Sequence, residues 1–230
     1  MTSQIVFLGF VLMCLCAGFV TLFLRAFYQK SYINALIFKG ISSLCFVAFG
    51  AINCLTNELS PTTILIFVGL CFGIIGDEII ALCYVMPEHD TPAFICGGSC
   101  FIMGHIVYVL ALLLLGKMNW IMLVVCFALG ASLSMLYEKR KKFLSNDMKR
   151  PLAMYLGIVI FMMSAAAGLL FKSATLGAGL FTLGGILFTV SDNILFAYKI
   201  GEKPDFKQNI VLHIAYYLAQ FAIAWSISLL

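Results

Sequence analysis

Long apolar runs, separated by short polar connections, recur along the whole chain of 230 residues. A run of about 20 such residues is the length that an α-helix needs to cross the hydrocarbon core of a bilayer. We therefore expect an all-α polytopic membrane protein, an eight-transmembrane-helix bundle that forms a single integral membrane domain over residues 1–230. The predicted spans are residues 4–24, 31–53, 62–86, 92–115, 119–136, 151–170, 174–198 and 208–229.

The composition supports this class and excludes a water-soluble domain. Hydrophobic residues make up 63% of the chain, charged residues only 10%, and the mean hydropathy is +1.08. A soluble domain is usually about 45–50% apolar and about 25% charged. The net charge of +4 is therefore interpreted as a determinant of membrane orientation, and we expect no nucleic-acid partner.

The basic residues lie mainly in the connections after the first, third, fifth and seventh predicted spans. The opposite side carries only Lys117 and Lys172. Because basic loops stay in the cytoplasm, both termini are expected to be extracytoplasmic, in a bacterial plasma membrane or the endoplasmic reticulum. The residues on the basic side are Arg25, Lys30, Lys139, Arg140, Lys141, Lys142, Lys149, Arg150, Lys199, Lys203 and Lys207.

Two aspartates, Asp77 and Asp192, interrupt apolar runs. An ionisable side chain at mid-span costs about 2.5–3.5 kcal/mol and normally faces the bundle interior or a water-filled cavity. A helix rise of about 1.5 Å per residue places four groups from different spans at one depth in the cytoplasmic half. Such agreement favours a shared site. The four groups are Lys39, Asp77, Asp192 and Tyr216.

Other polar residues support the same region. His105 and Gln220 are expected several ångströms deeper, whereas Glu78 is rotated by about 100° from Asp77 and is a doubtful member. The uncharged candidates are Tyr108, Ser191, Asn193, Tyr216, Tyr217 and Gln220.

Short matches suggest a parallel 4+4 repeat, in which "GDEIIA" corresponds to "SDNILF" and "HIVY" to "HIAY". Glycines precede both aspartates. Small residues allow helices to approach closely, but they could equally leave room for an acyl chain, and the sequence leaves both interpretations open. These glycines are Gly69, Gly73, Gly76, Gly177, Gly184 and Gly185.

Taken in order, six motifs resemble the YhhN-like family of lysoplasmalogenases, which are eight-span membrane proteins. Two departures stand out: Gly40 follows Lys39 where the family often has proline, and Glu78 replaces a commonly uncharged residue. The motifs are "FKGIS", "CFGIIGDEII", "GHIVY", "YLGIVIFM", "GGILFTVSDNILFAYK" and "YYLAQ".

The resemblance implies hydrolysis of the vinyl-ether bond of a lysophospholipid, a lysoplasmalogen, to a fatty aldehyde and glycerophospho-ethanolamine or -choline. Asp77 and Asp192 would be catalytic, as a proton donor and a base that the sequence does not assign. No cofactor is expected beyond the lipid substrate and the bilayer, and the headgroup preference and oligomeric state stay open. The resemblance carries over Lys39, His105, Tyr108, Tyr216 and Gln220 as substrate-positioning residues. The polar residues Ser191, Asn193 and Tyr217 are further positioning candidates, and Lys199 is a candidate for the phosphate.

Three alternatives stay open at this point. Buried charges and parallel repeats also describe small-molecule or lipid transporters, and a non-catalytic scaffold would need neither aspartate. A zinc hydrolase could use His105, His213 and one aspartate as ligands, although we expect no metal.

Overall fold

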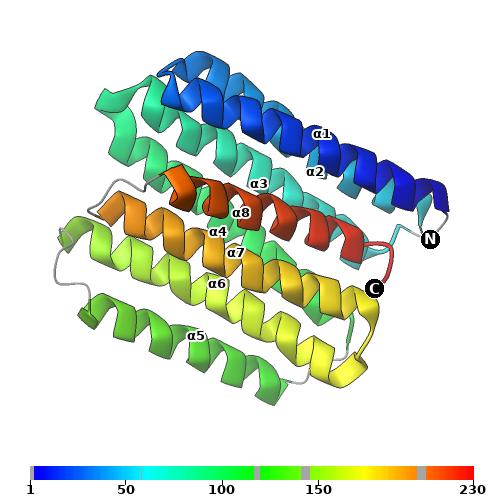
Figure 1. The fold of residues 1–230 in the computed structure, drawn as a ribbon. Coiled ribbons are helices and arrows are strands. Elements are labelled where there is room, and N and C mark those ends of the chain that lie inside the picture. Colours follow the sequence, from blue (N-terminus) through cyan, green and yellow to red (C-terminus); the bar gives the residue numbers. More distant parts are fainter. Residues whose placement is uncertain (1–2, 58, 117–119, 141–145, 201–205) are drawn as a thin grey trace.

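The computed structural model describes residues 3–57, 59–116, 120–140, 146–200 and 206–230, which fold into helices packed side by side in one bundle (Figure 1). No strand occurs in these ranges. Each predicted span falls on one helix, and the largest disagreement is the start of α6, which precedes Pro151. The elements are α1 (Ser3–Tyr28), α2 (Tyr32–Thr56), α3 (Pro61–Val85), the 3₁₀ turn η1 (Pro87–His89), α4 (Asp90–Leu114), α5 (Trp120–Arg140), α6 (Asn146–Ser173), α7 (Leu176–Ile200) and α8 (Phe206–Ser226).

Six helical segments within the described residues are long and apolar enough to cross a membrane, which marks the chain as a multi-pass membrane protein. They lie in α1, α2, α3, α4 with η1, α6 and α7. The apolar part of α5 is shorter, Trp120–Leu136. The hydropathy of α8 is lowered by buried polar residues such as Asn209, His213 and Gln220, which face protein instead of lipid. That α5 and α8 also cross the bilayer stays a prediction.

Local signals set the start of α3. Ser60 precedes α3 and Pro61 opens it, where the missing N–H of proline costs nothing. The Ser60 hydroxyl accepts a hydrogen bond from the Thr63 N–H at 3.2 Å, and the Thr63 hydroxyl accepts one from the Ser60 N–H at 3.0 Å. This capping box fixes where α3 begins, and hence the height of Asp77 four turns later.

The last helix lies in the centre of the bundle. α8 packs against α1, α2, α3 and α7, whereas α5 packs against α6 at the edge of the bundle opposite α1 (Figure 1). The start of α1 and the end of α8 lie at the same end of the bundle (Figure 1). The central position of α8 brings helices from the two halves of the chain to one place.

The glycines that precede the two aspartates are packed against neighbouring side chains. A Cβ added to Gly76 would lie 2.8 Å from the Phe101 ring, and one added to Gly184 would lie 2.6 Å from Ile223. Gly69 faces the ring of Tyr108 still more closely. These glycines therefore serve close helix packing, and the expectation that they leave room for an acyl chain is wrong at these positions.

We predict that Gly69→Ala lowers thermal stability, because the added methyl group meets the rigid ring of Tyr108. Overpacking of this kind costs about 1–3 kcal/mol, which exceeds the roughly 1 kcal/mol that alanine gains over glycine in a helix. Gly18→Ala is the matched control, because nothing lies within 4 Å of its added Cβ. Thermal unfolding in detergent measures both, and an unchanged midpoint for Gly69→Ala would contradict the packing.

Candidate functional site

Asp77 on α3 is 3% exposed and is held by donors from α2 and α8. The Lys39 Nζ lies 3.2 Å from Asp77 Oδ1 and also donates to the Asp77 backbone carbonyl at 3.2 Å. The hydroxyls of Ser43 and Tyr216 donate to Oδ2 at 2.7 and 2.6 Å. Lys39 and Ser43 are four residues apart and therefore share one face of α2. Both carboxylate oxygens of Asp77 are thus satisfied.

Two further residues of α8 hold these donors in place. The Gln220 Nε2 donates to the Tyr216 hydroxyl at 2.9 Å, from one helical turn away. The Tyr217 hydroxyl lies 3.3 Å from Ser43 Oγ and 3.5 Å from the Lys39 carbonyl oxygen, to which it donates. The "YYLAQ" motif of α8 therefore orients the donors around Asp77.

Asp192 on α7 is 4% exposed and accepts a hydrogen bond at Oδ2 from the Tyr155 hydroxyl of α6, at 2.9 Å. Within the described residues the one salt bridge is that of Lys39 with Asp77, so the two aspartates have different surroundings. Asp77 is paired with a cation, whereas Asp192 is bound by a neutral phenol.

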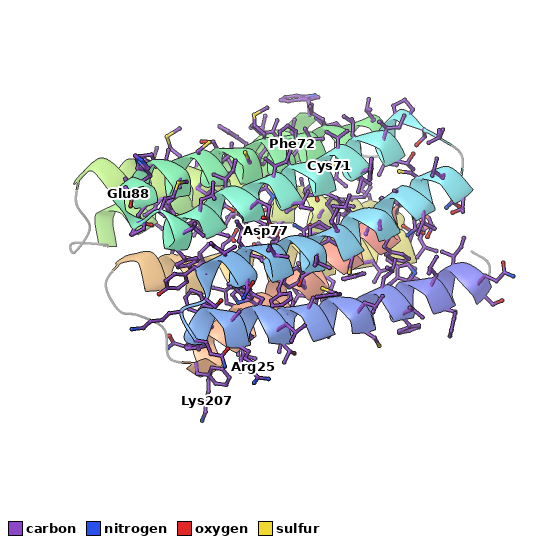
Figure 2. The ribbon with its side chains drawn as sticks, turned by 90° about the horizontal axis from the view of Figure 1, so that it is seen from above. Arg25, Cys71, Phe72, Asp77, Glu88 and Lys207 are labelled. Atoms are coloured by element: carbon purple, nitrogen blue, oxygen red, sulfur yellow. The ribbon has the colours of Figure 1, made fainter. Side chains whose placement is uncertain are left out.

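Both aspartates line one small cavity of about 50 Å³ in the bundle interior, and Figure 2 shows Asp77 inside the bundle, away from its ends. One water molecule needs about 10–15 Å³ of cavity volume. The space therefore admits a few water molecules but not a lipid. Its lining is Phe23, Lys39, Asp77, Ile80, Tyr84, Phe101, Ser191, Asp192, Leu195, Asn209, Leu212, His213 and Tyr216.

Five predicted site residues lie outside this cavity lining: Tyr217 and Gln220, described above, and Asn193, Tyr108 and His105. Asn193 is exposed and donates to the Thr189 carbonyl of its own helix at 2.8 Å, because it is rotated by about 100° from Asp192. Tyr108 is buried against Phe181, at 5.6 Å between ring centroids. His105 is also buried, and its ring lies 4.6 Å from Phe188.

The rings of His105 and Tyr155 are 6.0 Å apart, so His105 lies behind the tyrosine that binds Asp192. The site brings together five predicted residues, with Tyr217 and Gln220 one contact further out. Those five residues are Lys39, Asp77, Ser191, Asp192 and Tyr216.

Gly40 and Glu78, the two departures from the family motifs, face each other. Glu78 is half-buried and does not belong to the cavity lining. A Cβ added to Gly40 would lie 3.0 Å from Glu78 Oε1, so the bare glycine makes room for this carboxylate between α2 and α3. The doubt about Glu78 as a site residue is consistent with this position.

Several polar residues of the site were not predicted. Ser43 and Tyr155 donate to the aspartates, and His213 and Asn209 line the cavity. A neutral hydroxyl in an apolar helix carries no strong sequence signal. His213 was named in the "HIAY" match and as a possible zinc ligand. The described part of the chain holds no group of three or more His, Cys, Asp or Glu residues placed to bind a metal ion.

The family comparison covers all of this site except one residue. The model of the YhhN family matches residues 34–227. The chain belongs to the YhhN family. The match confirms the resemblance inferred from the motifs, and it includes every cavity residue but Phe23, which lies in α1. No curated protein and no solved structure matches the chain.

We predict that Lys39→Met destabilises this YhhN protein by about 3–5 kcal/mol, the usual cost of leaving one partner of a buried ion pair alone. Adding Asp77→Asn removes the orphaned charge and is expected to restore much of the loss. Lys172→Met, which changes an exposed lysine at the end of α6, is the control. Unfolding in detergent measures all three variants, and equal stability of Lys39→Met and the wild type would refute the role of the pair.

Proposed function

We propose that this protein is a membrane hydrolase, a lysoplasmalogenase, that cleaves the vinyl-ether bond of lysoplasmalogens. The observation that carries the proposal is the pair of buried aspartates, from α3 and α7, that line one cavity with room for water. Membership of the YhhN family supports it. The products are a fatty aldehyde and glycerophospho-ethanolamine or -choline.

The reaction needs one proton and one water molecule. Proton transfer to the β-carbon of the vinyl ether breaks the double bond and leaves an oxocarbenium ion. Water adds to that cation and loses a proton, which gives a hemiacetal. The hemiacetal then collapses to the aldehyde and the free glycerol hydroxyl. Two carboxyl groups perform analogous steps on the oxocarbenium-like transition states of glycosidases.

The surroundings of the two aspartates support different roles. We assign proton donation to Asp192, whose partner is the neutral Tyr155 hydroxyl. Asp77 is paired with the Lys39 ammonium, and we assign to it the stabilisation of the cation and the uptake of the proton of the attacking water. Tyr216 and Gln220 hold Asp77 in position, and Ser191 is placed to contact the water or the glycerol.

We also propose that the bundle is a parallel 4+4 repeat. The packing supports this arrangement, because α1 with α2, α2 with α3 and α3 with α4 have counterparts in α5 with α6, α6 with α7 and α7 with α8. The contact of α2 with α8 corresponds to that of α6 with α4. In each half, the helix before the acidic one supplies its partner: Ser43 for Asp77 and Tyr155 for Asp192.

The orientation is part of the same proposal. Arg25 and Lys207 lie toward one end of the bundle (Figure 2), on the basic side that the positive-inside rule assigns to the cytoplasm. The start of α1 and the end of α8 would then face away from the cytoplasm. The site lies in the cytoplasmic half of the membrane on this orientation.

We predict that Asp77→Asn and Asp192→Asn each abolish aldehyde release from a lysoplasmalogen by the purified protein in detergent. Asparagine keeps the shape of the side chain but can neither donate the proton nor act as the base. Asp90→Asn makes the same substitution at the start of α4, outside the cavity, and is expected to retain activity.

Two outcomes would change the proposal. Full activity of either variant, in a protein with wild-type unfolding behaviour, would remove that aspartate from the chemistry. A wild-type protein that binds the lipid and moves it between vesicle leaflets, yet forms no aldehyde, would favour the transporter.

A further inference from the structure

A large groove runs between α1 and α8 beside the acidic cavity. Its volume is about 660 Å³, within the range of about 300–1,000 Å³ that is typical of small-molecule sites and more than ten times the volume of the cavity between the aspartates. Its walls are mainly apolar, with Val20 and Leu24 on α1 and Ile214 and Leu218 on α8. A groove of this volume with apolar walls fits a single hydrocarbon chain.

One end of the groove is basic. Arg25 is exposed and belongs to the lining, next to Tyr28 and Gln29. Figure 2 places Lys207 of α8 toward the same end of the bundle as Arg25. Among the described residues of the lining there is no Asp or Glu. The charge therefore complements an anionic phosphate, for which an arginine is well suited.

The groove and the cavity share one wall. His213 lines both of them, and its ring packs on Phe23 of α1 with 4.8 Å between centroids. The Asn209 side chain, which lines the cavity, donates to the hydroxyl of Tyr28, which lines the groove, at 3.3 Å. The partition is thus a single layer of side chains between α1 and α8.

The positions of Lys207 and His213 along α8 agree with the dimensions of a lysophospholipid. Lys207 and His213 are six residues apart on α8, which corresponds to about 9 Å of helix rise. This length is comparable with an extended glycerophosphate. A phosphate at the basic end therefore brings the first bonds of the attached chain to the level of His213, beside the two aspartates.

We propose that the α1–α8 groove binds a single-chain phospholipid, with its phosphate at Arg25, and that the reacting bond reaches the aspartates past His213 and Phe23. This assignment rests on the proposed lysoplasmalogenase function. A second groove, of about 260 Å³ among α3, α4, α6 and α7, has no charged residue in its described lining. Within that described lining, the second groove offers no charged partner for a phosphate.

The test is photo-crosslinking with a saturated-ether lysophospholipid that carries a diazirine in its chain. This probe has no vinyl-ether bond, so labelling does not depend on hydrolysis. Peptide mass spectrometry of the wild type and of Asp192→Asn is expected to locate the label on α1 and α8. Label confined to the helices of the second groove would overturn the assignment.

Matched tryptophan substitutions test the groove itself. Ile214→Trp fills it and is expected to lose most of the label, whereas Ile37→Trp, at a residue of α2 with nearly equal exposure, is expected to keep it. The two isoleucines are 51% and 52% exposed, and Ile37 lies outside the groove lining. Equal labelling of the two variants would refute the groove.

Arg25→Gln tests the phosphate contact. Loss of one charge-assisted hydrogen bond is expected to weaken binding of the probe about tenfold. Arg25→Lys is expected to retain most of the affinity, and Lys172→Gln, in the last turn of α6, all of it. Equal affinities for Arg25→Gln and the wild type would remove Arg25 from the site.

The two proposals fail in different ways. Label on α1 and α8 without aldehyde release from a lysoplasmalogen would leave the groove standing and remove the hydrolase. Aldehyde release with label on other helices would keep the hydrolase and remove the groove.

Discussion

The ion pair between Lys39 and Asp77 is the interaction on which the interior of this bundle depends. A carboxylate among apolar helices needs a cation and hydrogen-bond donors, because no bulk water is there to solvate it. α2 supplies the cation and one hydroxyl, and α8 supplies the second hydroxyl. Satisfying one side chain therefore fixes three helices relative to one another. The same requirement explains why α8, the last helix, lies in the centre of the bundle.

Asp192 is accommodated differently, and the difference is the basis of the chemistry we propose. The Tyr155 hydroxyl of α6 donates a hydrogen bond to Asp192. The nearby charges are those of the Lys39–Asp77 ion pair. On this proposal, two identical side chains in one cavity acquire separate tasks from their neighbours, as paired carboxyl groups do in known hydrolases. The small volume between them matches the second reactant, water, whereas the lipid must approach from a larger space.

The sequence allowed the helices and the depth of the charges to be predicted, but not the rotation of each helix or the neutral partners. Apolar runs mark the helices because their length is set by the membrane. Lys39, Asp77 and Asp192 could be placed together because a charged side chain inside such a run normally faces the bundle interior or a water-filled cavity. Asn193 was grouped with its neighbour by height alone, although it faces outward. Tyr155 opens the motif "YLGIVIFM" but was not predicted as a site residue, because a tyrosine is tolerated on almost any helix face. Its bond to Asp192 depends on how α6 and α7 meet.

The segment that matches the YhhN family begins within α2, yet α1 forms one wall of the groove and contributes Phe23 to the cavity. The groups that we propose for proton transfer, Asp77 and Asp192, come from other helices. On this arrangement, selectivity for chain length can evolve through α1 without disturbing the acid–base pair. Exchanging α1 between relatives is therefore a route to new lipid preferences on an unchanged catalytic centre.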